Sequence, residues 1–177
     1  ETSEASVTID IAAVNDAPIL ATISDVSFDE DGSGSASLSG SDVDGDDLTY
    51  SVSVGTDITA TLTGSDIIFS APDNFNGSES FVVSVTDDEL TDSQTITVII
   101  NAVNDAPTAN AASGVTDEDQ SVVISLSGSD IDGDNLTFSA GNASNGSVNL
   151  DASFATYTPY ENYSGSDTFT FTVSDGL

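Results

Sequence analysis

Two loops of this chain carry three aspartates each at alternate positions. The six residues are Asp42, Asp44, Asp46, Asp130, Asp132 and Asp134. Two carboxylates about 4 Å apart repel by about 4 kcal/mol at an effective dielectric of 20, and the chain has no Lys, Arg or His to offset that repulsion. Each cluster therefore needs a bound cation or wide separation in solvent. Hard oxygen ligands in a flexible loop suit Ca²⁺ better than Mg²⁺, which requires strict octahedral geometry.

These loops do not follow the EF-hand pattern. Gly45 stands at loop position 4 rather than 6, and Ser53 and Gly141 stand where a bidentate Glu would be needed at position 12. The alternative interpretation is that the Asp-Gly pairs only form solvated turns. The metal interpretation is favoured because both triplets recur together with other acidic motifs of the chain.

The composition excludes several classes of partner. The 177 residues suffice for one or two small domains, and the formal charge is −31. Nucleic acid is excluded because no side chain can neutralise phosphate, and an anionic membrane surface is disfavoured for the same reason. With 37% hydrophobic residues in regular alternation, the chain is expected to fold. It has no signal peptide, no membrane-spanning run and no initiator Met, which predicts a piece of a longer protein that does not insert into a membrane.

A short joint interrupts the strand pattern twice. It reads Val-Asn-Asp-Ala-Pro at residues 14–18 and again at residues 103–107, 89 residues later. Proline has no N–H and a fixed φ, so a strand ladder must stop there. The joint is expected to connect consecutive domains, and its Asn and Asp add oxygen ligands.

Residues 19–102 carry about seven strand signals separated by Gly, Asp, Asn and Ser. They lie near residues 19–28, 35–39, 48–54, 58–63, 66–70, 81–85 and 96–100. No helical period appears, so the predicted fold class is all-β, with an antiparallel sandwich as the architecture. A small barrel is the alternative.

Residues 108–177 repeat the preceding segment at an offset of 88 residues. The repeat stops before its last strand, whereas residues 1–13 form a strand pattern without a sheet, with Val7, Ile9 and Ile11 on one face. We therefore expect three parts: residues 1–14 as the last strand of a preceding domain, residues 15–103 as domain one, and residues 104–177 as domain two. Residues 5–13 of the next unit are expected to complete domain two, head to tail, by a covalent array or by strand donation.

The motifs resemble those of cadherin-like and Ig-like tandem repeats found in giant bacterial surface adhesins. The resemblance rests on Val-Asn-Asp-Ala-Pro, Asp-x-Asp-Gly-Asp, Asp-Glu-Asp, and the Phe-Thr-Phe-Thr-Val-Ser-Asp-Gly of residues 169–176. It implies tandem seven-stranded Greek-key sandwiches, an extracellular position at the cell surface, and Ca²⁺ bound between consecutive domains.

The resemblance also implies two ligand sets. The set at the joint of domains one and two comprises Asp29, Glu30, Asp31, Asn104, Asp105, Asp130, Asp132, Asp134 and Asp175, with Asp73 as a weak stand-in for a further acidic ligand. The set at the other joint comprises Asn15, Asp16, Asp42, Asp44, Asp46 and Asp87, with Asp117, Glu118 and Asp119 from the preceding unit.

Three functions compete. The first is a Ca²⁺-rigidified structural repeat of an extracellular filament or adhesin stalk. The second is a carbohydrate- or protein-binding module, for which Tyr157, Tyr160 and Tyr163 are the only aromatic cluster. The third, most remote, is a glycosidase-type enzyme, because carboxylates are the only side chains present that could act as acid and base. We expect no enzyme, because no carboxyl with a raised pKa can be picked out from the sequence. The repeats discriminate the other two functions, since a stalk feature should recur in both repeats whereas a ligand site should differ between them.

Overall fold

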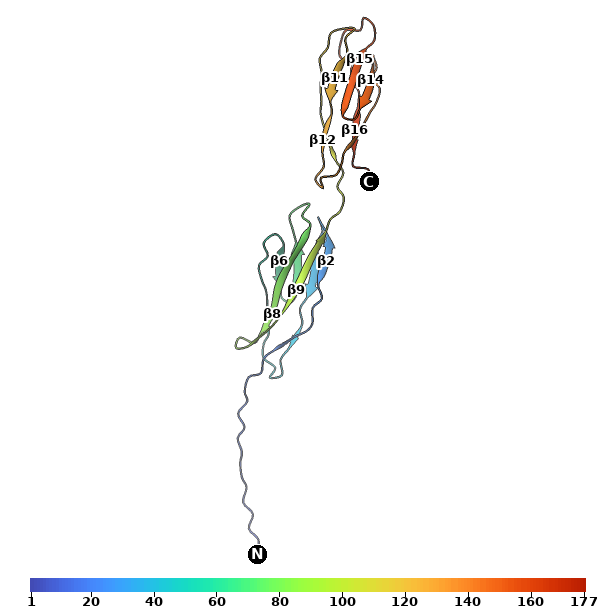
Figure 1. The fold of residues 1–177 in the computed structure, drawn as a ribbon. Coiled ribbons are helices and arrows are strands. Elements are labelled where there is room, and N and C mark those ends of the chain that lie inside the picture. Colours follow the sequence, from blue (N-terminus) through green and yellow to red (C-terminus); the bar gives the residue numbers. More distant parts are fainter. The chain divides into compact units, whose positions relative to one another are not determined.

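The computed structural model describes residues 1–177 and contains strands but no helix. No segment is therefore a helix long and apolar enough to cross a bilayer. The chain divides into two compact units, residues 1–103 and residues 104–177, called domain one and domain two below (Figure 1).

Domain one is a sandwich of two main sheets. Its strands are β1 (Ile19–Leu20), β2 (Val26–Asp29), β3 (Gly34–Ser37), β4 (Gly40–Ser41), β5 (Thr49–Val52), β6 (Thr59–Thr63), β7 (Asp66–Ser70), β8 (Gly77–Thr86) and β9 (Thr91–Asn101). One sheet has the order β2-β9-β8-β5 and the other β3-β7-β6, while β1 pairs with β4. All pairs are antiparallel except β2 with β9, which is parallel.

The core of domain one follows the period of two along its strands. Phe81, Val83 and Val85 alternate along β8, and all three are 0% exposed. On the other sheet, Phe69 packs with its ring centroid 5.2 Å from that of Phe81. Because successive side chains of a strand point to opposite faces, this alternation directs one face of each sheet inward.

The predicted first strand over residues 19–28 is wrong as a single strand. It divides into β1 and β2, which pair with different partners. Between them, the Ile23 N–H donates to Gln94 Oε1, and Gln94 Nε2 donates to the Ile23 carbonyl. The side chain of Gln94 thus satisfies the backbone where the chain passes from one sheet to the other.

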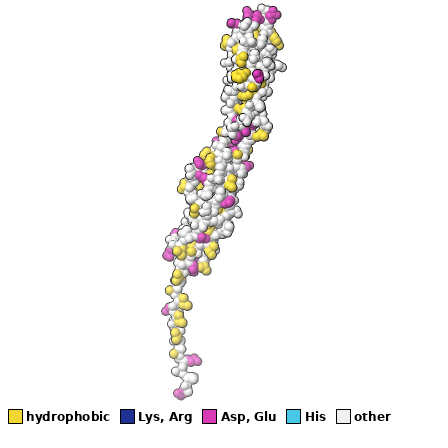
Figure 2. All heavy atoms as spheres, viewed as in Figure 1, with side chains coloured by type: hydrophobic (Ala, Val, Ile, Leu, Met, Phe, Trp, Pro, Cys, Tyr) yellow, Lys and Arg dark blue, Asp and Glu magenta, His cyan; other side chains and the backbone are white.

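Residues 1–13 form no strand within this chain. That they form the last strand of a preceding domain stays a prediction. A strand requires a neighbour for its N–H and C=O groups, and no other segment pairs with these residues. The side chains of Val7, Ile9 and Ile11 are 85%, 78% and 89% exposed, and Figure 2 shows this N-terminal segment lined with hydrophobic side chains.

Domain two has the same kind of sheets with fewer pairings. Its strands are β10 (Thr108–Asn110), β11 (Val122–Ser125), β12 (Ser127–Ser129), β13 (Thr137–Ala140), β14 (Gly146–Asp151), β15 (Phe154–Pro159) and β16 (Phe171–Ser174). The sheets have the orders β11-β15-β14, β10-β12 and β13-β16. At the offset of 88 residues, the counterpart of β9 of domain one would follow Leu177.

The segments of domain two that correspond to the two neighbours of β9 differ from their counterparts in domain one. Residues 114–117 correspond to β2 but form no strand, and residues 165–169 correspond to the first half of β8 and form none either. Phe169 and Phe171, the counterparts of Phe81 and Val83, are only half-buried. Domain two therefore has a smaller sealed core, with Leu126 and Ala155 as its buried hydrophobic residues.

Candidate metal centre

The first acidic loop lies between β4 and β5, and it is organised around Asp42. The Oδ1 atom of Asp42 accepts hydrogen bonds from the backbone N–H groups of Asp44, Gly45 and Asp46 at 2.8, 3.1 and 3.4 Å. Gly45 has a φ of +83°, a conformation that glycine adopts without steric cost. This turn brings three carboxylates together, with one oxygen atom of each of Asp42, Asp44 and Asp46 within 4.8 Å of the others.

The second acidic loop, between β12 and β13, repeats this arrangement. The Asp134 N–H donates to Asp130 Oδ1 at 3.1 Å, and Gly133 has a φ of +80°. Carboxylate oxygens of Asp130, Asp132 and Asp134 again lie within 4.8 Å of one another. The duplicated sequence therefore produces a duplicated geometry.

The joint residues of each domain contact the acidic loop of the same domain. In domain one, the Asp16 N–H donates to Asp44 Oδ2 at 2.9 Å, and Asn15 Nδ2 donates to Asp87 Oδ2 at 3.0 Å. The joint is thus held against the acidic loop by a backbone contact, and against the turn between β8 and β9 by a side-chain contact.

Domain two has the equivalent pair of contacts. The Asp105 N–H donates to Asp132 Oδ2 at 2.7 Å, and Asn104 Nδ2 donates to Asp175 Oδ2 at 2.7 Å. Six predicted ligands therefore gather at one end of each domain. They are Asn15, Asp16, Asp42, Asp44, Asp46 and Asp87 in domain one, and Asn104, Asp105, Asp130, Asp132, Asp134 and Asp175 in domain two.

In each cluster, one buried carboxylate oxygen has no hydrogen-bond partner in the protein and is suited to binding a cation. Asp42 Oδ2 and Asp130 Oδ2 are buried and have no hydrogen-bond partner. An unpaired buried acceptor is costly, and the cost is greatest for an ionised group. With further carboxylates around each oxygen, the donor set is the one that a hard cation such as Ca²⁺ binds.

The pKa shifts of carboxyls in and beside the clusters also favour a bound cation. Partial burial raises the pKa of Asp46, and the negative charges of Asp42, Asp44 and Asp87 raise it further. By contrast, hydrogen bonds lower the pKa of two flanking carboxyls. That of Asp87 is lowered first by the Leu90 N–H and then by Asn15, and that of Asp175 first by Asn104 and then by the Leu177 N–H. The flanking groups thus remain ionised, while the repulsion is concentrated within the triplet.

The acidic turn after β2 lies at the other end of domain one. Glu30 is only 7% exposed, and its carboxylate accepts from the Val103 N–H and from Asn76 Nδ2. Asp29 Oδ1 accepts from Asn101 Nδ2 at 3.1 Å.

Asp31 has a φ of +60°, and its Oδ1 accepts from the Asn74 N–H at 2.8 Å. Glu30 thus contacts the backbone that leads into the second joint, whereas Asp31 closes a corner. Asp73 lies exposed beside that corner.

The corresponding turn of domain two is more open. Asp119 has a φ of +61°, and its Oδ1 accepts from the Asn162 N–H, as Asp31 does from Asn74. Asp117 and Glu118 are exposed. Glu118 lacks the burial of Glu30 because no segment in this domain takes the place of β9 and the residues that follow it.

Two acidic residues that position loops were missed at the sequence level. The Glu79 carboxylate accepts from the N–H groups of Thr56, Asp57 and Ile58 at 2.9 to 3.1 Å. Its counterpart Asp167 accepts from the N–H groups of Ser144 and Asn145. The available signal was an acidic side chain at matching positions of two otherwise Ser- and Thr-rich segments.

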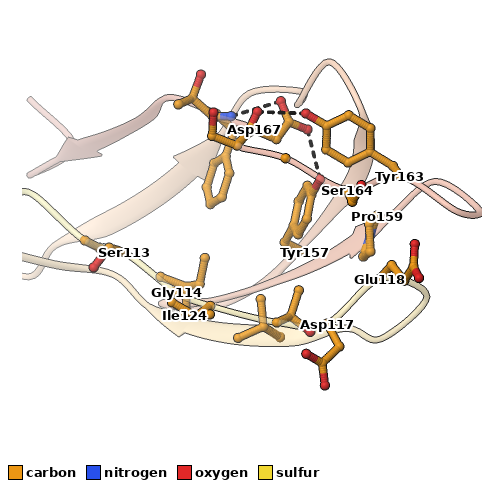
Figure 3. A pocket seen from close by; sticks show the side chains of 18 of the residues that line it. Ser113, Gly114, Asp117, Glu118, Ile124, Tyr157, Pro159, Tyr163, Ser164 and Asp167 are labelled. Carbon is orange, nitrogen blue, oxygen red and sulfur yellow. Dashed lines mark hydrogen bonds between the residues drawn. The ribbon is translucent and has the colours of Figure 1, made fainter.

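Two of the three tyrosines line a cavity of domain two. Tyr157 and Tyr163 line a cavity of about 900 Å³ in domain two, together with Gly114, Ile124 and Asp167 (Figure 3). Tyr160 is exposed and does not line it.

Hydrogen bonds tie the rim of this cavity together. Tyr157 donates its hydroxyl proton to Asp167 Oδ2 at 3.0 Å, and the Tyr163 hydroxyl donates to the Ser166 carbonyl at 2.8 Å. Burial and the bond to Asp167 raise the pKa of Tyr157. Partial burial works to raise the pKa of Asp167, but the bonds donated by Asn145, Thr168, Tyr157 and Ser144 outweigh it and hold that pKa below the ordinary value.

Comparisons with known proteins agree with this architecture. The bacterial Ig domain family matches residues 15–99 and residues 104–177. The human protocadherin-24 EC1-2 structure, form II, is 18% identical with a TM-score of 0.55, over 89% of this chain and 94% of that one. An endo-fucoidan hydrolase of glycoside hydrolase family 107 is 21% identical over 90% of this chain but only 27% of its own, with a TM-score of 0.41. No curated protein matches the chain significantly.

Both family matches coincide with the sandwiches described above, and together they cover most of the chain. The protocadherin likeness supports the same all-β, Ig- and cadherin-like fold. The chain therefore belongs to the bacterial Ig domain family, as two tandem domains.

Proposed function

We propose that this chain is a Ca²⁺-stiffened structural repeat of an extracellular filament or adhesin stalk. The observation that carries the proposal is the duplicated cluster, in which Asp42 Oδ2 and Asp130 Oδ2 are buried without a hydrogen-bond partner. A feature that recurs at the same place in consecutive domains suits a structural role. The bacterial Ig family is consistent with a surface module of this kind.

The residues that would hold the cation come from two kinds of segment. The loop triplets Asp42, Asp44, Asp46 and Asp130, Asp132, Asp134 would supply most of the charge. The joints already contact these loops through the N–H groups of Asp16 and Asp105, and contact Asp87 and Asp175 through the amides of Asn15 and Asn104. A bound Ca²⁺ would supply attraction among carboxylates that otherwise repel, and so immobilise the joint on the loop.

The acidic turns would complete this arrangement from the adjoining domain. In the proposal, Asp29, Glu30 and Asp31 face the cation site that begins at Asn104, as the cadherin resemblance implies. Asp117, Glu118 and Asp119 have the same role toward the joint of a following copy. Fixed angles between consecutive domains would then make a string of repeats stiff. The protein would lie outside the cell, have no catalytic role, and join copies of itself head to tail.

A second candidate function is binding of a ligand such as a carbohydrate. The observation in its favour is the cavity of domain two beside Tyr157 and Tyr163. Aromatic faces of this kind bind apolar faces of ligands. Titration with oligosaccharides, followed by chemical shifts of the two tyrosines, tests this function, and shifts confined to the cavity would support it.

The test of the main proposal is calorimetric unfolding in Ca²⁺ and in chelator. A cation that binds only the folded state adds about 4 kcal/mol when its concentration is a thousandfold above Kd. Because that is a large share of the stability of a domain this small, we expect the melting temperature to fall by many degrees in chelator. NaCl at matched ionic strength controls for simple screening. An unchanged melting curve in chelator would exclude the proposal.

A further inference from the structure

The cavity of domain two occupies the place that β9 fills in domain one. In domain one, β9 lies between β2 and β8, parallel to the first and antiparallel to the second. Its side chains Ile96, Val98 and Ile100 are 1%, 0% and 3% exposed. In domain two, the segments that correspond to β2 and to the first half of β8 line the cavity instead, as Gly114–Asp117 and Gly165–Phe169 (Figure 3).

The walls of this cavity have the chemistry of a site for a strand. Val122, Ile124, Phe169 and Phe171 present apolar side chains to it. Along residues 114–117 and 165–169 the backbone belongs to no sheet. Such a groove offers an apolar floor and, on two sides, backbone that belongs to no sheet, to which an added β-strand can pair.

The N-terminal segment of the same sequence has the pattern required to fill it. Val7, Ile9 and Ile11 alternate as Ile96, Val98 and Ile100 do, and each trio is followed after the same interval by Val-Asn-Asp-Ala-Pro. The exposed Ile99 position of β9 is taken by Asp10, which would face solvent. In the present chain this segment pairs with nothing, although its three apolar side chains are almost fully exposed.

We propose that the cavity of domain two accepts residues 5–13 of a second copy of this chain as its missing strand. This inference rests on the head-to-tail assembly of the proposed function and specifies how the copies join. The register follows from domain one, where Val26 pairs with Val98 and Phe81 with Ile96. The incoming Ile9 therefore lies beside Gly114, and the incoming Val7 lies beside Phe169.

The same register gives Glu118 a role. Glu30 of domain one accepts the N–H of Val103, two residues after β9. The corresponding residue of an incoming segment is Val14, so Glu118 accepts its N–H and becomes buried. This contact sets the joint residues Asn15 and Asp16 of the second copy beside the acidic turn of domain two, which links strand docking to the proposed cation site.

Directed disulfide formation tests the register. In β8 and β9, Ser80 pairs with Thr97, so Thr168 of one chain should oppose Thr8 of the next. The native chain has no cysteine, so the double variant Thr8→Cys, Thr168→Cys introduces the only thiols. Directly opposed strand residues lie within disulfide distance. Under mild oxidation we expect a ladder of multiples of 17.9 kDa on a denaturing gel, whereas Thr8→Cys with Thr172→Cys, out of register, should give none.

Two further variants identify the occupant. Adding Ile9→Asp to the in-register pair should reduce the ladder roughly tenfold or more, because it places a charge in an apolar groove. Adding Val54→Asp, at a position 96% exposed in domain one, should leave the ladder intact. A cross-linked monomer in place of a ladder would mean that the segment closes on its own chain, and absence of any cross-link would leave the cavity to another ligand. Either result overturns the proposal.

The experiment is repeated in chelator to separate the two proposals. If the ladder forms in chelator and the melting temperature does not depend on Ca²⁺, strand docking is supported and the Ca²⁺ site is rejected. If Ca²⁺ strongly raises the melting temperature but no ladder forms, the Ca²⁺ site is supported and strand docking is rejected. If the first double variant fails to fold in its reduced form, Ser6→Cys with Thr170→Cys tests the same register, since Val82 pairs with Thr95.

Discussion

The two oxygens of one carboxylate in each acidic loop distinguish a simple turn from a cation site. The Oδ1 atoms of Asp42 and Asp130 are occupied by backbone N–H groups of their own loops, which is what a turn requires. Their Oδ2 atoms are buried without a partner, which a turn does not require. The two oxygens of one carboxylate thus have separate roles, and only the second calls for a cation.

Asp130→Asn separates these roles. The amide keeps an acceptor for the Asp134 N–H but removes the charge and the second carboxylate oxygen. We expect the Ca²⁺ affinity of the domain-two site to fall roughly tenfold or more, because ligand charge sets affinity in such sites. The domain-one site should be unchanged. Isothermal titration calorimetry measures both classes of site.

The matched control is Asp151→Asn, which removes the same charge at an exposed position at the end of β14. If both variants weaken Ca²⁺ equally, the cation responds to the general negative field and the loop is only a turn.

Glu79 is a residue whose protonation state supports a loop. Hydrogen bonds from the N–H groups of Asp57, Ile58 and Thr56 hold its pKa below the ordinary value of 4.5, against a smaller opposing effect of burial. A carboxyl whose pKa is depressed in the folded state contributes stability above its unfolded-state pKa. That contribution is lost as the pH falls through the folded-state pKa.

We therefore expect Glu79→Gln to melt at a lower temperature than the native chain near pH 7, and the gap to narrow as the pH falls through the folded-state pKa of Glu79, which lies below the ordinary 4.5. Thermal melts at a series of pH values from 7 downward measure this. Asp57→Asn, an exposed change of equal charge in the same loop, should show no such pH-dependent gap. A gap for Glu79→Gln that persists at the lowest pH would show that the carboxylate charge is unimportant.

At the level of elements, β9 accounts for most of the difference between the two domains. It pairs with β2 and β8 and covers Phe81, Val83 and Val85, which are fully buried. Without such a strand in domain two, the side chains of Phe169 and Phe171 are half-buried and residues 114–117 form no strand. A strand is therefore stabilised by its neighbours more than by its own sequence.

Paired truncations test this reasoning. Phe81→Ala should destabilise domain one by about 3–5 kcal/mol, as expected for a fully buried aromatic ring. Phe169→Ala should destabilise domain two by less than about 2 kcal/mol, since the side chain loses less burial. Native-state hydrogen exchange resolved by segment gives both values. The measurement is made in the Ile9→Asp background, so that no second copy covers Phe169. Equal losses would mean that domain two is as well packed as domain one.

At the level of the whole molecule, the charge has one sign only. The formal net charge is −31, with no Lys, Arg or His, and Figure 2 shows acidic side chains on both domains without any basic one. Self-repulsion of this kind opposes the compact state, and only ions from solution reduce it.

We expect added NaCl to raise the melting temperature of both domains in chelator, because the Debye length falls from about 10 Å at 0.1 M to about 3 Å at 1 M. Calorimetry at several salt concentrations measures the effect. Choline chloride should act equally, since screening does not depend on the identity of the cation. A melting temperature independent of salt would show that the surface charges are already too far apart to matter.

Much of this architecture could be predicted from the sequence, because the signals are local. Alternation with a period of two located β6, β7, β8 and β9 and identified the inward faces. The prolines of the two joints marked where ladders end. The offset of 88 residues put both acidic triplets at equivalent positions of the two repeats, and the cadherin resemblance implied that they gather with Asn15, Asp16, Asn104 and Asp105.

Other features depended on the tertiary structure, because they arise from partners far apart in the chain. The division of residues 19–28 into β1 and β2 depends on pairing with β4 and β9. The burial of Asp42 Oδ2 and the support of residues 56–58 by Glu79 depend on loops brought together by folding. Residues 26–29 form a strand and residues 114–117 do not, although they occupy equivalent places in the repeat, because β9 lies beside the first segment and no strand of this chain lies beside the second.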